Sequence, residues 1–211
     1  MSDVYDRISE IRVVPVIAIE SVDSAVPLAD ALLAGGLPIA EITFRTSAAA
    51  DVIALLKKER PQLLIGAGTV LTEENARRAK DCGAQFAVSP GLNPSVVKAS
   101  LDAGLPIAPG VMTPSDIEAG LSFGLKVLKF FPAGAAGGPG MLKSVAAPYM
   151  HLGVKFIPTG GVTLENMGEY LQHGFVLGVG GTWLAKKDLI AAADWDTITE
   201  NCRAAVAAAA L

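Results

Sequence analysis

Short apolar runs alternate along the chain with longer segments in which Ala, Leu and charged residues recur at helical spacing. Apolar runs rich in β-branched residues are typical of strands, whereas a period near 3.6 is typical of helices. The pattern predicts strands at 13–19, 39–44, 64–69, 85–89, 107–112, 127–131, 155–158 and 176–180. Between them it predicts helices at 24–33, 48–59, 73–81, 94–103, 115–121, 141–147 and 164–172.

The order of these elements indicates the fold class. Eight repeats of strand and helix in 211 residues favour an α/β fold, a closed (β/α)8 TIM barrel, because a doubly wound sheet more often has five or six strands. No linker or low-complexity segment interrupts the repeat, so we expect a single domain over residues 1–211, with a short helix before the first strand. The Ala-rich segment 204–210 predicts a terminal helix.

Capping signals support several of the predicted helix starts. Asn93 and Thr113 each stand directly before a proline, which is favoured at the first position of a helix. Thr113 and Asp116 have the spacing of a capping box. Both signals place helices directly after predicted strands, as the barrel requires.

Lys129 is the least expected residue within a predicted strand, because its neighbours are Val-Leu before it and Phe-Phe-Pro after it. Such a run is typical of a strand buried on both faces. Removing a lysine ammonium from water is unfavourable, and the group often responds by losing its proton. A neutral lysine amine is the nucleophile that forms Schiff bases with carbonyl compounds. Lys129 is therefore a candidate for covalent catalysis.

Strand parity places three charges together. Alternate residues of a barrel strand point inward, and Glu41, Thr43 and Arg45 share one face of the run 39–45, which holds the strand at 39–44 and the residue after it. Since helices cover the outside with apolar contacts, this polar face should be the lumen. We expect Glu41 and Arg45 to meet Lys129 there. Two interpretations without function are possible. Glu41 and Lys129 could form an ion pair that only neutralises two buried charges, and Arg45 could lie on the rim of the barrel as a surface residue.

Two glycine-rich turns, at 158–161 and 178–182, follow the seventh and eighth predicted strands. Barrel enzymes frequently bind phosphate at this place, where backbone N–H groups and a helix N-terminus hold the anion. Simple chain reversal is the alternative. The strand end Gly66–Thr69, small residues followed by a hydroxyl, is a weaker candidate for ligand contact, and a simple tight turn is the alternative.

Composition and charge exclude several classes of function. A net charge of −4 without a basic stripe argues against nucleic acid as a partner, and no run of about 18 apolar residues supports a membrane span. The acidic N-terminus lacks a signal-peptide pattern, so we expect a cytoplasmic protein. Cys82 and Cys202 form no CxxC pair, and no His, Asp or Glu cluster has metal-ligand spacing, so we expect no disulfide framework and no metal.

Eight motifs occur in order along nearly the whole chain: VVPVI (13–17), AGGL (34–37), EITFRT (41–46), GAGTVL (66–71), SPGL (89–92), KFFPA (129–133), PTGG (158–161) and GGTWL (180–184). Together they resemble the 2-keto-3-deoxy-6-phosphogluconate (KDPG) aldolase and 4-hydroxy-2-oxoglutarate aldolase family. The resemblance implies a homotrimeric (β/α)8 barrel and a class I aldol cleavage of a phosphorylated 2-keto acid, to pyruvate and glyceraldehyde 3-phosphate. It implies no cofactor and no metal, only a covalent Schiff base.

The resemblance also implies a role for each matching residue. Lys129 matches the Schiff-base lysine and Glu41 the glutamate that moves protons. Arg45 and Thr69 match the residues that hold the pyruvyl carboxylate.

Further matches surround the substrate. Pro90 and Phe131 match residues that shape the pocket around bound pyruvate. Gly160, Gly161 and the backbone near Thr182 match the phosphate site.

Three positions depart from the family's usual residues. Thr182 stands where serine is frequent, which keeps the hydroxyl. Gly134 stands where a glutamate is frequent, which leaves substrate preference on the aldehyde side open. Phe44 replaces a usual leucine on the outward face.

Several functions remain open at this point. A related aldolase could prefer the galactonate epimer or unphosphorylated 4-hydroxy-2-oxoglutarate. An aldose–ketose isomerase or epimerase would need Glu/His pairs or metal-binding carboxylates at strand ends, and the sequence lacks them. A non-catalytic sugar-phosphate-binding barrel is the alternative from another class.

Overall fold

The computed structural model describes residues 3–210. The strands within them are β1 (Val13–Ile17), β2 (Ile39–Thr43), β3 (Leu64–Gly68), β4 (Phe86–Val88), β5 (Ile107–Ala108), β6 (Gly110–Val111), β7 (Val127–Phe130), β8 (Lys155–Pro158) and β9 (Val179–Gly181). All their pairings are parallel.

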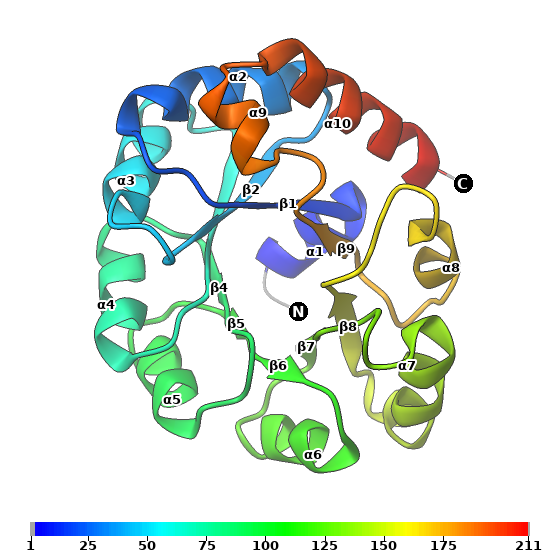
Figure 1. Cartoon of the computed structure of the whole chain (residues 1–211). Coiled ribbons are helices and arrows are strands. Elements are labelled where there is room, and N and C mark those ends of the chain that lie inside the picture. The colour runs from blue at the N-terminus through cyan, green and yellow to red at the C-terminus, as the bar shows by residue number, and fades with distance from the viewer. Residues whose placement is uncertain (1–2, 211) are drawn as a thin grey trace.

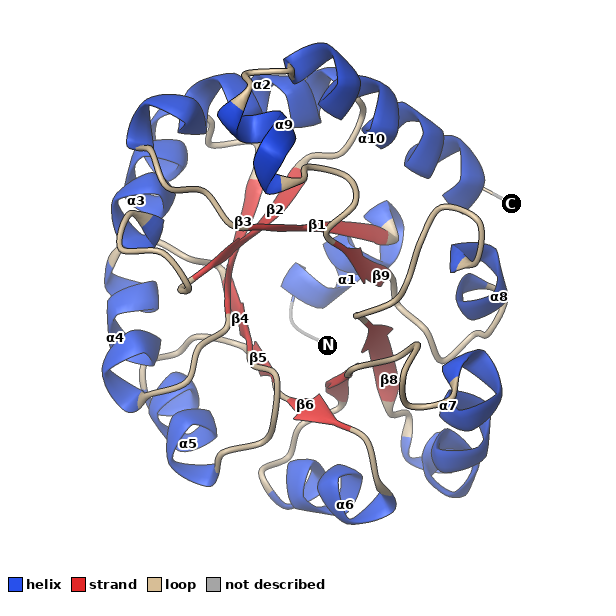
Figure 2. Ribbon diagram, viewed as in Figure 1, coloured by secondary structure: helices blue, strands red, loops and turns tan. Residues whose placement is uncertain are grey.

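The helices follow the strands in alternation. They are α1 (Asp3–Ile11), α2 (Ala25–Ala34), α3 (Ala49–Glu59), α4 (Glu73–Asp81), α5 (Pro94–Asp102), α6 (Pro114–Ser122), α7 (Gly138–Ala146), α8 (Met167–Leu171), α9 (Lys187–Ala191) and α10 (Trp195–Ala209), with short 3₁₀ helices η1 (Val22–Ser24) and η2 (Ala147–Leu152). The strands surround a centre, and helices α2–α8 and α10 lie outside them (Figures 1 and 2), as expected for an α/β fold. The expected helix before the first strand is α1. The terminal helix begins at Trp195, well before the predicted start, and α9 was not predicted.

The strands do not form the single closed eight-stranded sheet expected from the sequence. Within residues 3–210 they form a curled six-stranded sheet, β5-β4-β3-β2-β1-β9, and a three-stranded sheet, β6-β7-β8. Pro109 separates β5 from β6, because proline has no N–H to donate to a ladder. On the other side, only isolated bridges, Phe156 to Val176 and Thr159 to Gly180, connect β8 with the β9 segment.

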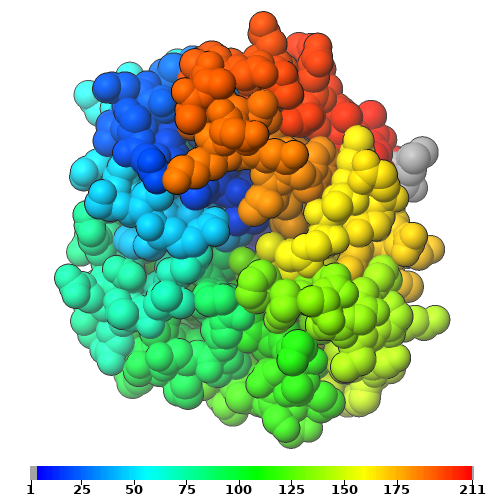
Figure 3. All heavy atoms as spheres, viewed as in Figure 1, coloured from blue at the N-terminus to red at the C-terminus, as the bar shows by residue number. Residues whose placement is uncertain are grey.

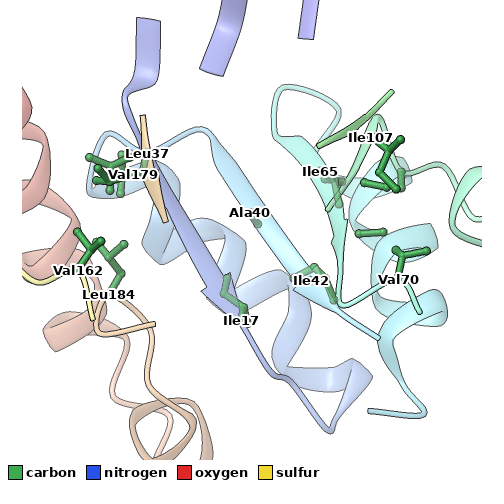
Figure 4. Packing of buried hydrophobic residues seen from close by; sticks show 14 of the residues in the cluster. Ile17, Leu37, Ala40, Ile42, Ile65, Val70, Ile107, Val162, Val179 and Leu184 are labelled. Carbon is green, nitrogen blue, oxygen red and sulfur yellow. The ribbon is translucent and has the colours of Figure 1, made fainter. Parts of the chain in front are cut away.

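Two apolar clusters lie on opposite faces of the strands. The outer cluster lies between strands and helices and includes Leu128, as well as Ala40 and Ile42, which Figure 4 shows. The inner cluster includes Ile39 of β2 and Val127 of β7. Alternation along a strand therefore separates the two faces, and the parity that places Glu41 with Ile39 inside the ring is confirmed.

Helix α1 covers the amino ends of the strands. Its residues Tyr5 and Ile8 belong to the inner cluster, and Ile8 is fully buried. In Figure 2 this helix lies behind the strands, near the centre of the ring. The opposite end, where the strands finish, carries the polar residues.

Capping residues explain where the helices begin. The Thr113 side chain accepts from the Asp116 N–H, and the Asp116 side chain accepts from the Thr113 N–H, so the predicted capping box is confirmed. Asn93 caps α5 as predicted, by accepting from the Ser95 N–H. Asp194 caps α10 by accepting from the Thr197 N–H, which explains the early start of that helix.

Candidate active site

Lys129 and Glu41 form a buried pair inside the ring. Lys129 Nζ lies 3.5 Å from Glu41 Oε1, and the two residues are only 5% and 3% exposed. Lys129 comes from β7 and Glu41 from β2, which lie in different sheets. The expectation that these charges meet is confirmed.

Gly68 makes room for the Glu41 carboxylate. A Cβ built on Gly68 at the end of β3 would collide with Glu41 Oε1 and Cγ. Gly68 also pairs with Thr43 across the β2–β3 ladder. The missing side chain at this position therefore determines where the carboxylate can lie.

Arg45 follows β2 and carries a positive charge to the same end of the ring. Its Nε donates to Thr43 Oγ1 at 3.2 Å, and the residue is exposed. Within residues 3–210, no carboxylate lies at ion-pair distance from its guanidinium. The guanidinium is thus placed to bind an external anion.

Thr69 directly after β3 and Phe131 directly after β7 line the same cavity as Lys129. Thr69 has φ of 57°, a left-handed conformation that a β-branched residue rarely adopts. Such backbone conformations concentrate at ligand sites. The Phe131 ring lies 5.4 Å from Lys129 Nζ, measured to the ring centroid, and supplies an apolar wall with a face that favours a cation.

The turn after β8 depends on two glycines. Gly160 and Gly161 have φ of 88° and 78°. The Gly134 N–H donates to Gly160 O at 2.8 Å, and a Cβ on Gly134 would approach Gly161 Cα to 3.2 Å. Gly134 and the turn therefore pack backbone against backbone.

These side chains surround one cavity of about 130 Å³. All nine residues predicted as site residues line it, namely Lys129, Glu41, Arg45, Thr69, Pro90, Phe131, Gly160, Gly161 and Thr182. Its volume equals that of roughly four liquid waters, which suits a small polar molecule.

The cavity has further walls that the sequence reasoning did not single out. Thr159 is 5% exposed, and a Cβ on Gly180 would collide with its hydroxyl. Val16 at the end of β1 also lines the cavity. Thr159 shares the inward parity of Ile157 in β8, so the rule that selected Glu41 would also have found Thr159.

A larger cavity of about 440 Å³ lies at the other end of the strands. Its wall includes Tyr5 and the residues that lead into β5 and β7, and it is mainly apolar. Burial raises the pKa of the Tyr5 hydroxyl. Lys126 is its one charged residue, so it lacks the set of polar groups that converge on the smaller cavity.

Two other features of residues 3–210 bear on function. No group of three or more His, Cys, Asp and Glu side chains in this part of the chain is arranged to hold a metal ion. None of the helices described there is long and apolar enough to cross a membrane.

Known proteins resemble this chain over nearly its whole length. Residues 4–201 match the family described as "Aldolase: KDPG and KHG aldolase". The 2-dehydro-3-deoxy-phosphogluconate aldolase of Treponema pallidum is 47% identical over 199 residues, 94% of each chain. The KHG/KDPG aldolase of Escherichia coli K12 is 44% identical over 199 residues, 94% of this chain and 92% of that protein.

A solved structure resembles this chain in both fold and sequence. The KDPG aldolase of Legionella pneumophila, with pyruvate captured at low pH as a covalent carbinolamine, is 40% identical with a TM-score of 0.90. The match covers 95% of this chain and 97% of that one. This chain belongs to the KDPG and KHG aldolase family.

Proposed function

We propose that this protein is a class I aldolase that cleaves KDPG to pyruvate and glyceraldehyde 3-phosphate. The observation that carries the proposal is the buried Lys129 amine beside Glu41, at the wall of a small polar cavity. The family and the carbinolamine of the Legionella relative support the same chemistry.

The proposed mechanism begins at Lys129. Its unprotonated amine adds to the C2 ketone to give a carbinolamine, and loss of water gives an iminium. Glu41, through a water, removes the C4 hydroxyl proton, and the C3–C4 electron pair flows into the iminium as the bond breaks. The aldehyde leaves, and an enamine remains on Lys129.

Glu41 then returns the proton to the methylene carbon of the enamine, and hydrolysis of the iminium releases pyruvate and the free amine. The 3.5 Å separation between Nζ and Oε1 supports this assignment, because one carboxylate can reach both the amine and the adjacent carbons of a bound substrate. Glu41 therefore acts as base in the cleavage half and as acid in the protonation half.

The other seven predicted site residues bind substrate in this proposal. Arg45 donates a pair of hydrogen bonds to the pyruvyl carboxylate, and the Thr69 hydroxyl donates to the same group. Pro90 and Phe131 enclose the pyruvyl carbon chain. The backbone N–H groups of Gly160, Gly161 and Thr182 bind the phosphate. The two glycines have no side chain that would keep an anion away from the backbone.

The decisive experiment is to trap the intermediate. The protein is incubated with pyruvate and borohydride, and the modified residue is located by mass spectrometry. We expect a reduced pyruvyl adduct on Lys129, none in Lys129→Ala, and an undiminished adduct in Lys143→Ala, which removes an exposed lysine of α7. If wild-type protein forms no adduct, the chain is a sugar-phosphate-binding barrel and not an aldolase.

The substrate range follows from the same site. We propose a phosphorylated 2-keto acid as the main substrate, as in Entner–Doudoroff sugar-acid breakdown, with 4-hydroxy-2-oxoglutarate and the galactonate epimer as lesser substrates. The comparison of kcat/KM for KDPG and for its unphosphorylated analogue tests the proposal. Equal values for the two would reject a functional phosphate site.

We also propose that the two sheets act as one closed (β/α)8 barrel and a single domain. The Lys129 N–H donates to Pro109 O at 2.9 Å, so contact with the β7 backbone continues across the break between β5 and β6. The bridge between Thr159 and Gly180 supports closure on the other side. One cooperative unfolding transition with coincident probes is expected, and two separate transitions would contradict it.

A cytoplasmic homotrimer is the proposed form of the protein. This assembly rests on the family resemblance, and exposed apolar side chains such as Leu71 and Met112 near the carboxyl ends of the strands are compatible with it. Light scattering coupled to gel filtration gives the mass directly. A mass of one chain at micromolar concentration would reject the trimer.

A further inference from the structure

Thr43 lies between Glu41 and Arg45 on the inward face of β2, and it has no role in the mechanism above. The residue is 0% exposed, whereas Arg45, two positions later, is exposed. A buried hydroxyl must satisfy its hydrogen-bonding capacity within the protein. Its partners therefore show what it does.

The Thr43 hydroxyl of β2 forms hydrogen bonds with both β1 and Arg45. Its Oγ1 donates to Ile17 O in β1 at 2.9 Å and accepts from Arg45 Nε at 3.2 Å. A hydroxyl has a single proton. Because that proton is directed to Ile17, the oxygen lone pairs are left facing Arg45.

This contact limits how Arg45 can move. An arginine side chain at the end of a strand has several rotatable bonds, and within residues 3–210 no carboxylate holds this one. The Thr43 oxygen is the partner that its guanidinium has in this part of the chain. Since Nε is engaged, the two terminal nitrogens remain free for an anion.

We propose that Thr43 is a positioning residue for binding of the substrate carboxylate. Its hydroxyl oxygen holds Arg45 Nε, so that the two terminal nitrogens of the guanidinium meet the carboxylate end-on. The inference rests on the proposed function, because it needs a 2-keto acid as ligand. It adds a specificity element to the site: the preorganised fork distinguishes a 2-keto acid from a simple ketone of the same size.

Three variants test the role of the hydroxyl. Thr43→Val keeps the shape and removes the hydroxyl, Thr43→Ser keeps the hydroxyl, and Thr43→Ala removes both hydroxyl and methyl. Each is incubated with borohydride and increasing pyruvate, and in parallel with increasing acetone, which forms the same iminium on Lys129 but has no carboxylate. The measured quantity is the ratio of the two half-saturating concentrations, which does not depend on the amount of folded protein.

We expect Thr43→Val and Thr43→Ala to raise the half-saturating concentration of pyruvate by about tenfold, the size typical of a weakened hydrogen bond to a charged group, and to leave that of acetone unchanged. Thr43→Ser should resemble wild type. For KDPG cleavage, the same loss should appear mainly in KM, because the carboxylate is bound in both ground and transition states.

The competing role for Thr43 is purely structural, a hydrogen bond to Ile17 O that connects β2 with β1. Loss of this structural hydrogen bond would disturb Lys129 and Glu41 together, so the half-saturating concentrations of pyruvate and acetone would rise in parallel. That outcome would overturn the inference. Failure of the proposed function looks different, since then wild-type protein itself forms no adduct with either compound.

A double-mutant cycle tests whether Thr43 acts through Arg45. Lysine lacks the Nε that Thr43 holds, so Thr43→Val should add little to the defect of Arg45→Lys. If Thr43→Val raises the half-saturating pyruvate concentration by the same factor in both backgrounds, Thr43 acts by another route and the inference fails.

Discussion

Lys129 Nζ lies 3.5 Å from Glu41 Oε1, although 88 positions separate the two residues in the chain. Both are almost completely buried, so each is the main polar partner of the other. Removal of either member would leave the other as an unpaired buried charge, so the pair bears on stability as well as on the proposed reaction, and the two effects can be separated by mutation.

Lys129→Met should abolish KDPG cleavage and also destabilise the fold. Glu41 would remain buried without its partner, and removing one member of a buried pair typically costs about 3–5 kcal/mol. Urea unfolding measures the free energy of unfolding, and a coupled pyruvate assay measures turnover.

The double variant Lys129→Met/Glu41→Gln is the control. It stays inactive, but it removes the isolated charge and should recover part of the lost stability. A single variant as stable as wild type would show that the buried pair contributes nothing to folding.

Gly68→Ala should impair catalysis at Glu41. The added Cβ would collide with the carboxylate and displace it, and a displacement near 1 Å costs about 10²-fold in rate. The expected change is in kcat for KDPG cleavage, while borohydride trapping of pyruvate on Lys129 persists.

Gly140→Ala is the matched control, because nothing lies within 4 Å of a Cβ built there and the residue is in α7. It should leave kcat unchanged. Equal kcat values for Gly68→Ala and wild type would contradict the role of Gly68.

Arg45→Lys should raise KM for KDPG by roughly ten- to hundredfold. A lysine ammonium keeps the charge but cannot form the planar, forked pair of hydrogen bonds to a carboxylate. Steady-state kinetics provide the measurement. An unchanged KM would place the substrate carboxylate elsewhere.

The capping box of α6 should contribute to stability in a pH-dependent way. Burial raises the pKa of the Asp116 carboxyl, but hydrogen bonds from the Met112 N–H, the Thr113 N–H and the Thr113 hydroxyl outweigh it, and the pKa is lowered overall. A lowered folded-state pKa means that this contribution is present above the ordinary aspartate pKa, near 4, and is lost as pH falls through the folded-state value.

Thr113→Ala should therefore lower the free energy of unfolding by about 1 kcal/mol at neutral pH. The difference from wild type should shrink in acid, where Asp116 is protonated in both proteins. Ser115→Ala, at an exposed neighbouring position, is the control. Thermal unfolding of the three proteins from pH 7 to pH 3 measures the effect, and a pH-independent difference would show that the hydrogen bond from the Thr113 hydroxyl to the Asp116 carboxylate contributes nothing to stability.

The space-filling view adds one contact that local sequence patterns do not predict. In Figure 3 the segment near residue 187 lies beside the segment near residue 20 on the face toward the viewer. Lys187 Nζ lies 2.7 Å from Glu20 Oε1, with both side chains exposed. Exposed pairs of this kind contribute little to stability, so they leave no strong signal in the hydrophobic pattern.

Local periodicity by itself determined which way each side chain points. Alternation placed Glu41 and Lys129 on inward faces, and capping chemistry placed the start of α6 at Thr113, because both depend on neighbours a few positions away. The resemblance to a known family added the other members of the site, and all nine predicted residues line the same cavity.

Only the tertiary structure decided how far apart these groups lie and what holds them. The 3.5 Å between Lys129 and Glu41 and the contact of Thr43 with Ile17 depend on the register and closure of strands distant in the chain. Side-chain direction follows from the local backbone, whereas separation follows from how all the strands pack together. The sequence therefore predicted the members of the site, and their geometry came from packing across the whole ring.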